Sequence, residues 1–281
     1  MRGRTVTRMA TTTMAEKPGK TLVNYSVTDG VALLELDDPP ANTYTHEMMR
    51  QIDEAVLKAR FDENAFVIVI TGAGDKFFSA GANIAMLNSV TPEFKYQFCL
   101  HANETLLRLE HTPKLVIAAL NGHTVGGGLE IAMAADIRIA RKDGGKIGLP
   151  EVNLGVLPGT GGTTRLTRLV GKAKAIELMV TGMNYTFEEA KDWGIVNSVL
   201  AGDVKQFREA VMDYARQFCP PHKASMAVGH IKRSVQSGAD VPIETALAIE
   251  RELQSLLFKS EDAKEGIRAY VDKKVPSFKG K

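Results

Sequence analysis

The chain has 281 residues, of which 44% are hydrophobic and 24% charged, and its formal net charge is +2. These proportions are typical of a globular protein, so they exclude an intrinsically disordered chain, a collagen-like chain and a disulfide-stapled scaffold. A chain of this length buries roughly three quarters of its unfolded surface, which suffices for a hydrophobic core without a structural metal.

Charge and cysteine content narrow the classes of partner. The 35 Lys and Arg residues nearly cancel the 33 Asp and Glu residues, so there is no overall basic field to attract nucleic acid. Cys99 and Cys219 lie far apart and outside any C-x-x-C motif, which fits a reducing compartment and excludes a cysteine zinc site. Apolar runs stay well below the roughly 20 residues of a membrane span. We therefore expect no metal, no nucleic-acid or membrane partner, and a cytoplasmic protein.

The N-terminal segment is the one anomaly in composition. Residues 1–13 are rich in Arg and Thr, and the first acidic residue is Glu16. This composition is typical of a transit peptide, which would place the protein in the mitochondrial matrix. A disordered leader, a vector-derived tail, or a true start at Met9 or Met14 would also explain it, and the segment is too short and too poorly amphipathic to favour targeting. We predict that residues 1–18 form a flexible leader outside the fold.

From residue 19 to about residue 200, patterns of strands and helices alternate. Short apolar or alternating runs predict strands, and apolar residues at helical spacing predict amphipathic helices. The expected strands are 31–36, 66–70, 115–120, 136–140 and 194–200, and the expected helices in this part are 45–60 and 94–109. Strands separated by helices predict an α/β core with a mainly parallel or mixed sheet over residues 19–200.

Beyond residue 160 the pattern becomes largely helical. The expected helices are 163–169, 172–180, 187–193, 207–218, 243–258 and 262–275. We treat residues 201–281 as a helical C-terminal region. Its charged outer faces suit either a cap over the α/β core or a surface for contacts between subunits.

Two segments of small residues follow expected strands and carry the candidate chemistry. Residues 78–83 follow the strand at 66–70, and the glycine-rich residues 121–130 follow the strand at 115–120 and open a helix. Backbone N–H groups at two such turns can together hold an oxyanion. The same glycines are also explained by tight turns and close packing.

Two carboxylates flank these turns. Glu130 follows the glycines on an otherwise apolar helix, and Glu151 precedes a mostly apolar loop. A carboxylate held in apolar surroundings has a raised pKa and can exchange protons near neutral pH. Glu151 as an ordinary loop carboxylate is the alternative. Together the two groups could orient one water and exchange protons with a carbon acid whose enolate oxygen lies between the amides.

With these residues in place, the sequence resembles the crotonase (enoyl-CoA hydratase/isomerase) superfamily. The resemblance runs from about residue 22 to the C-terminus. Three matching stretches are F-S-A-G-A-N at 78–83, I-A-A-L-N-G-H-T-V-G-G-G-L-E-I-A-M-A-A-D at 117–136 and G-L-P-E-V-N-L-G-V-L-P-G-T-G-G-T-T-R-L at 148–166. The later stretches A-x-E-L-M-V-T-G at 175–182 and A-K-D-W-G-I-V-N at 190–197 also match. Such long, ordered and dispersed agreement is more specific than any single glycine cluster.

The resemblance implies a spiral of ββα units with a helical C-terminal region that assembles homotrimers, often paired into homohexamers. Members of this superfamily bind acyl-CoA thioesters and stabilise the thioester enolate with two backbone amides. On this sequence the two oxyanion-hole amides would be those of Ala82 and Gly127. The expected contacts with the substrate and its CoA are Ala80, Ala82, Asn83, Ile84, Ala85 and Gly127.

The resemblance also implies a reaction. Glu130 and Glu151 occupy the two positions that are both glutamates in hydratases, so we expect syn addition of water to 2-trans-enoyl-CoA, giving 3-hydroxyacyl-CoA. Glu130 would deprotonate the water that attacks C3, and Glu151 would protonate C2. No separate cofactor is expected, because coenzyme A is part of the substrate. A 3,2-enoyl-CoA isomerase, a specialised acyl-CoA lyase and a non-catalytic or RNA-binding member are the alternatives.

Some positions depart from the pattern of the superfamily. A lysine that is common in the superfamily is replaced by Ala85, so Lys95, or Lys273 and Lys274 of a neighbouring subunit, are candidate partners for the CoA phosphates. Tyr44 replaces a commonly aliphatic residue and would either line the acyl pocket or lie in the core. Thr164 stands where Gln is frequent, with no clear consequence.

Overall fold

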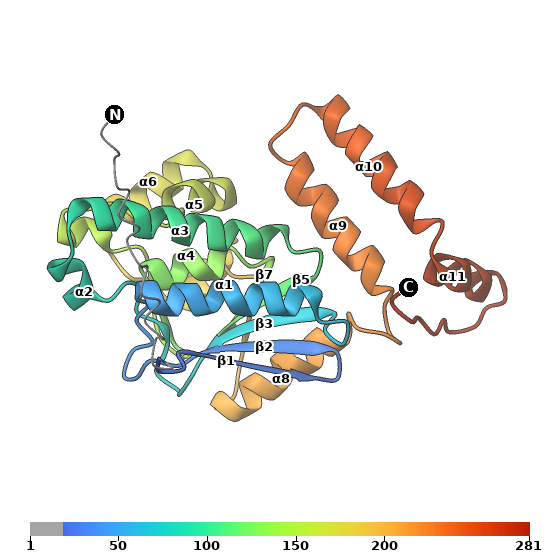
Figure 1. Ribbon diagram of the computed structural model, residues 1–281, viewed down its shortest axis with the longest axis horizontal. Helices are drawn as coiled ribbons and strands as arrows, with labels where there is room; N and C mark the ends of the chain where they lie inside the picture. Colours follow the sequence, from blue (N-terminus) through green and yellow to red (C-terminus); the bar gives the residue numbers. More distant parts are fainter. Residues whose placement is uncertain (1–18) are drawn as a thin grey trace, which may run out of the picture.

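The structure is a computed structural model that describes residues 19–281, drawn in Figure 1. The predicted leader, residues 1–18, lies outside the described residues. Along the described chain, no helix combines the length and apolar character needed to cross a membrane.

The main sheet passes through the centre of the molecule. Its strands are β1 (Val23–Thr28), β2 (Val31–Leu36), β3 (Val67–Gly72), β5 (Leu115–Leu120), β7 (Ile137–Arg141) and β9 (Ser198–Leu200). They form the six-stranded sheet of the described chain and lie side by side in this order. Strand β1 is antiparallel to β2, and every other neighbouring pair is parallel. Every residue of β3 and β5 is buried, as their fully apolar runs predict.

A smaller parallel sheet lies beside the main one. It contains β4 (Phe77–Ser79), β6 (His123–Val125) and β8 (Ile147–Gly148), in that order. The chain enters the main sheet, crosses to the small sheet and then turns into helical structure, and it repeats this path after β3, β5 and β7. This repetition is the ββα spiral that the resemblance implies, and it places each turn after the small sheet near the next one.

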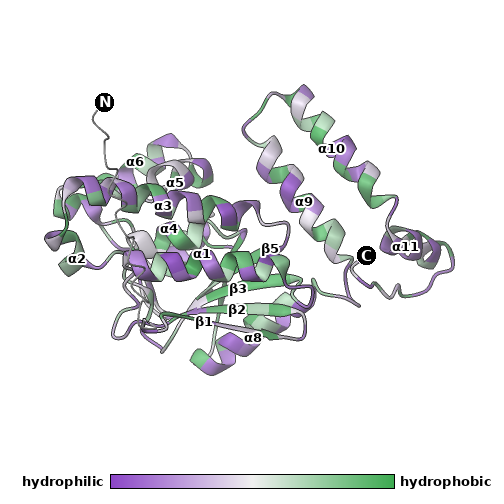
Figure 2. Ribbon diagram, in the orientation of Figure 1, coloured by the Kyte–Doolittle hydropathy of each residue, from purple (hydrophilic) through white to green (hydrophobic). Residues whose placement is uncertain are grey.

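Helices cover both faces of the main sheet (Figure 1). On one face lie α1 (His46–Phe61) and α3 (Pro92–His111), whose buried side chains belong to the larger core cluster. On the other face lies α8 (Val204–Arg216), which packs Phe207, Val211 and Ala215 against β3 and β5. Figure 2 shows the same division, with hydrophobic residues along the strands and mixed colours on the outer helices. The sheet therefore forms a rigid platform that is apolar on both faces.

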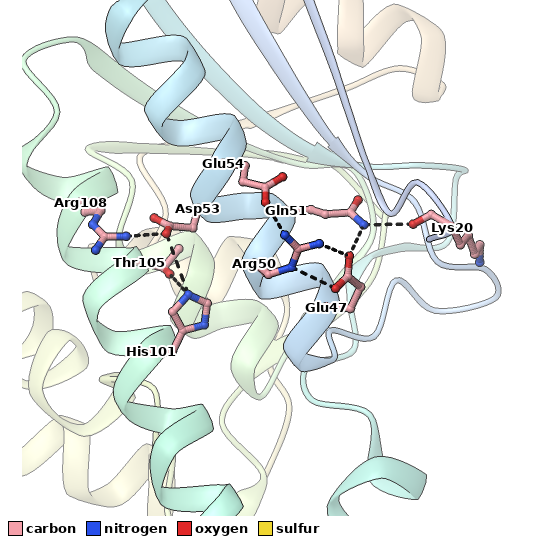
Figure 3. A network of polar contacts seen from close by, with 9 residues as sticks. All are labelled: Lys20, Glu47, Arg50, Gln51, Asp53, Glu54, His101, Thr105 and Arg108. Atoms are coloured by element: carbon pink, nitrogen blue, oxygen red, sulfur yellow. Dashed lines mark hydrogen bonds and ion pairs between the residues drawn. The ribbon is translucent and has the colours of Figure 1, made fainter. Parts of the chain in front are cut away.

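Polar contacts on the outer side of this platform fix α1 against α3 (Figure 3). Asp53 of α1 pairs with Arg108 of α3, and His101 Nε2 lies 3.9 Å from the same carboxylate oxygen. Within α1, Arg50 bridges Glu47 at 3.0 Å and Glu54 at 2.6 Å. The contacts of Asp53 with Arg108 and His101 join α1 to α3, whereas the Arg50 pairs stabilise α1 itself.

The remaining helices of the described chain lie between strands along the sequence or in the C-terminal region. They are α2 (Ile84–Ser89), α4 (Gly127–Met133), the 3-10 helix η1 (Glu151–Leu154), α5 (Gly162–Val170), α6 (Lys172–Val180), α7 (Phe187–Asp192), α9 (Ser225–Gly238), α10 (Ile243–Leu257) and α11 (Glu261–Val271). Two predicted boundaries are wrong for a backbone reason. The helix predicted over 262–275 ends at Val271, because Lys273 has a φ of +55°. The strand predicted over 194–200 begins only at Ser198, because the amides of Ile195 and Val196 bond back to Ala190 O at the end of α7.

The sequence patterns did not predict α9, and its glycine explains why. A Cβ at Gly229 would lie 2.3 Å from Pro113 O, so only glycine lets α9 pack this closely on the core. Glycine is a poor helix former, which weakens the helical pattern in the sequence. Helices α9, α10 and α11 extend away from the α/β core, with α9 beside α10 (Figure 1).

A buried ion pair fastens α9 to the core. Lys232 Nζ lies 2.9 Å from Asp136 Oδ2 and donates to the carbonyl oxygens of Leu109 and Lys114 at 3.2 and 3.1 Å. The two charged side chains are only 4% and 12% exposed. Burial raises the pKa of Asp136 and lowers the pKa of Lys232, so each charge depends on the other.

Replacement of this lysine tests its anchoring role. Lys232→Met leaves the Asp136 charge buried without its partner, so we expect the free energy of unfolding to fall by about 3–5 kcal/mol. Denaturant titration followed by circular dichroism measures the change. The control is Asp240→Asn, which breaks the exposed Arg168–Asp240 pair (3.1 Å) and should cost less than about 1 kcal/mol. Equal losses in the two variants would contradict the anchoring role.

Candidate active site

Two turns of the spiral meet where the glycine-rich segments were expected to lie. One turn follows β4 and the other follows β6, and these two strands pair directly. Gly81 has a φ of +84°, and a Cβ at this position would lie 2.8 Å from the backbone nitrogen of Gly127. Only glycine combines that conformation with that approach. The two turns are therefore in backbone contact.

The amides of Ala82 and Gly127 lie at this contact. A bridge between Tyr44 and Ala82 uses the Tyr44 amide, which donates to Gly81 O, and the Asn83 amide, which donates to Tyr44 O, both at 3.0 Å. The Ala82 amide takes no part in this bridge. Gly127 is the first residue of α4, so its amide precedes the first donors of the helix. The structure brings together the two turns that carry the predicted amides.

Glu130 is buried on α4 and held by the loop that leads into α5. The residue is 2% exposed, and Oε1 accepts hydrogen bonds from the amides of Thr160 and Gly162, both at 2.7 Å. Burial is the largest influence and raises the pKa of Glu130, while these hydrogen bonds and the charge of Arg165 oppose the rise. The side chain is fixed in one orientation by two strong acceptor contacts.

Glu151 is less constrained than Glu130. It begins η1, and its Oε1 lies on the glycine turn, 3.1 Å from where a Cβ of Gly126 would be. Its Oε2 is buried and has no hydrogen-bond partner among residues 19–281. Burial, with a smaller contribution from the charge of Glu130, raises the pKa of Glu151 to about 7. A carboxyl group with this pKa holds and releases a proton near neutral pH.

The other predicted substrate contacts surround the turn after β4. Ala80 and Ala82 are partly buried, whereas Ile84 is 56% exposed and Ala85 is exposed in the first turn of α2. Asn83 Oδ1 caps α2 by accepting from the Met86 amide at 2.9 Å. The Asn83 side chain is thus engaged in the fold, and the exposed part of this segment is apolar.

Two further residues lie at the site. The sequence left the location of Tyr44 open, and sequence reasoning missed Thr160. Tyr44 is 2% exposed and lies beside Gly127, and its hydroxyl is 3.0 Å from Thr160 Oγ1. Thr160 was not singled out, because its contact with Tyr44 spans 116 positions of sequence. The only sequence signal was its place in the matching stretch 148–166.

The described part of the chain contains no group of three or more His, Cys, Asp or Glu residues that could hold a metal ion. The groups gathered at the site are two carboxyls, two turns with backbone amides, and hydroxyls. They can polarise a carbonyl oxygen and move protons at a neighbouring carbon.

Comparisons with known proteins agree with this arrangement. Residues 26–281 match the enoyl-CoA hydratase/isomerase family. The chain is 36% identical to a short-chain-enoyl-CoA hydratase of Clostridium acetobutylicum, over 89% of this chain and 95% of the relative. It is 35% identical to a crotonyl-CoA hydratase of Syntrophomonas wolfei, over 88% of this chain and 94% of the relative.

Solved structures show the same likeness. An enoyl-CoA hydratase structure from Geobacillus kaustophilus superposes with a TM-score of 0.90 at 44% identity, covering 94% of this chain and 98% of that chain. The chain therefore belongs to the enoyl-CoA hydratase/isomerase family.

Proposed function

We propose that the protein is an enoyl-CoA hydratase that adds water across the 2,3-double bond of an enoyl-CoA thioester. The observation that carries this proposal is a pair of carboxyls in unlike surroundings beside the two amide turns, with Glu130 buried and Glu151 half-buried. Glu130 is fixed by two hydrogen bonds to Oε1, while Glu151 has an unpartnered oxygen and a pKa of about 7. A pair with such different surroundings suits one base and one acid.

The amides of Ala82 and Gly127 bind the thioester oxygen. As C3 is attacked, negative charge develops on this oxygen, and two preorganised N–H donors stabilise it as an enolate. Removal of one such donor typically costs about 2.7–4 kcal/mol of transition-state stabilisation. The close contact between the two turns is therefore as important as the carboxyl groups.

The carboxyl groups supply and accept the protons. Glu130 takes a proton from water while the water oxygen bonds to C3, and the electrons of the double bond pass to C2 and the thioester. Glu151 then gives its proton to C2, which leaves Glu130 protonated and Glu151 ionised. Because both groups flank the same amide pair, we expect water and proton to add to the same face. Coenzyme A enters as part of the substrate, and the reaction needs no further cofactor.

We also propose that the chain assembles into a homotrimer or homohexamer through its C-terminal helices. Large apolar side chains on α9 and α10 are exposed, including Ile231 (63%), Val235 (64%), Ile243 (65%) and Leu256 (50%). Exposed apolar groups of this number on neighbouring helices suit an interface. The two free cysteines fit a cytoplasmic location.

Sedimentation equilibrium of the purified full chain tests this assembly. We expect a mass of three or six chains over a range of protein concentration. A monomer at micromolar concentration would contradict the proposal.

Substitution of the two carboxyls tests their roles. We expect Glu130→Gln and Glu151→Gln each to lower kcat for hydration of crotonyl-CoA by roughly 100-fold or more, because each removes one proton-transfer group. Loss of the enoyl-thioester absorbance measures the rate, and binding of the substrate by calorimetry serves as the control for folding. If Glu130→Gln keeps the wild-type rate of hydration, the assignment of the base is wrong.

The pH profile tests the proton count. Hydration needs Glu130 ionised and Glu151 protonated, and dehydration needs the reverse, so one proton on the pair serves both directions. We expect kcat/KM for both directions to show the same bell shape, with the alkaline side falling from about pH 7 as the proton leaves the pair. A rate that stays constant up to about pH 9 would count against this assignment.

A further inference from the structure

Tyr44 lies between the two turns that carry the Ala82 and Gly127 amides. Its backbone pairs with the segment that carries the Ala82 amide. Its ring lies against the second turn, because a Cβ at Gly127 would be only 2.4 Å from Tyr44 Cε1 and Oη. Phe98 of α3 supports the ring from another side, with the centroids 5.6 Å apart. A single buried residue thus contacts both turns, one through its backbone and the other through its ring.

The hydroxyl of Tyr44 reaches the loop that holds Glu130. It lies 3.0 Å from Thr160 Oγ1, and Thr160 is 2% exposed. The amide of Thr160 donates to Glu130 Oε1 at 2.7 Å. Tyr44, Thr160 and Glu130 therefore form one continuous chain of buried polar groups.

A carboxylate only accepts, so the Thr160 amide donates to the ionised Glu130. The Tyr44 and Thr160 hydroxyl oxygens lie 3.0 Å apart, and either hydroxyl can be the donor. Burial and the nearby Glu130 charge raise the pKa of Tyr44, so its phenol stays protonated and is able to donate to Thr160. Hydrogen bonds in such a chain strengthen one another.

We propose that Tyr44 and Thr160 are positioning residues of the hydratase site, which orient Glu130 and favour its ionised form through the contact of the Tyr44 hydroxyl with Thr160 and the hydrogen bond from the Thr160 amide to Glu130. This inference rests on the proposed role of Glu130 as the base. Neither hydroxyl touches the reacting atoms in this scheme. Through its ring, Tyr44 also keeps the Gly127 turn at a fixed separation from the Ala82 segment.

Other charges near Glu130 act on it independently of this chain. Arg165 lowers the pKa of Glu130, while Glu151 is coupled to it by repulsion. Cys99 of α3 also lies within the electrostatic reach of Glu130. The variants below leave these three groups unchanged, so a shift in the pH profile reports on the hydroxyl chain.

Two conservative variants break the chain at different points. Tyr44→Phe removes the phenol hydroxyl but keeps the ring on Gly127, and Thr160→Val removes the partner hydroxyl but keeps the amide that binds Glu130. We expect each to lower kcat for crotonyl-CoA hydration by roughly tenfold with KM changed by less than about twofold, since the buried hydrogen bond that fixes the Thr160 amide against Glu130 is lost. The acidic side of the pH profile should move up by about 0.5–1 unit, because an ionised Glu130 with less support has a higher pKa.

The double variant shows whether the two hydroxyls act as one unit. We expect Tyr44→Phe combined with Thr160→Val to lose no more activity than the more damaged single variant, which is the mark of coupled residues. The matched control is Tyr25→Phe, which removes a phenol hydroxyl that donates to Asp62 at 3.0 Å outside the site. It should keep the wild-type kcat and pH profile.

Different outcomes separate this inference from the proposed function. If the wild-type protein does not hydrate enoyl-CoA, the proposed function fails first. If the wild type is active, unchanged kcat and pH profile in both single variants would overturn the positioning role, as would losses that simply add in the double variant. If only one variant folds, its kcat and its shift in the pH profile decide the matter, because a loss of stability alone does not move the acidic side of the profile.

Discussion

The buried carboxylate of Glu130 is the constraint on which the site depends. Removing a carboxylate from water costs several kcal/mol unless hydrogen bonds and charges replace the solvent. Here two backbone amides converge on Oε1, so the loop before α5 must lie against α4. That requirement joins the second and third turns of the spiral. The same contacts hold the proposed base at a fixed position relative to the amide of Gly127.

The backbone around Glu130 explains the rest of the geometry. The turns after β4 and β6 touch at Gly81 and Gly127, where a side chain on Gly81 would collide with the facing amide. The rigid main sheet sets the spacing of these turns, because β3 and β5 are buried along their whole length. Glu151 lies against the turn after β6, next to Gly126, with one buried oxygen unpartnered. The proposed acid thus differs from the proposed base through surroundings that the fold dictates.

Sequence patterns predicted most of this arrangement, for identifiable reasons. Fully apolar runs marked the buried strands, and the carboxylate on an apolar helix marked Glu130 as unusual. The strands of the small sheet were missed because two or three residues are too few to show a period. The chain from Tyr44 to Thr160 could not be found either, because a contact across 116 positions follows from the fold and not from local pattern. The sequence therefore allowed the reactive groups to be predicted, whereas the residues that position them were found only in the structure.

Hydration of crotonyl-CoA in deuterium oxide tests the central claim most directly. If two carboxyls add water across the double bond, the product is 3-hydroxybutyryl-CoA with one deuterium at C2, on the same face as the new hydroxyl. Nuclear magnetic resonance of the product gives both the position and the face of the deuterium. A product that has gained no hydroxyl at C3, or that carries deuterium on the opposite face, would contradict the account.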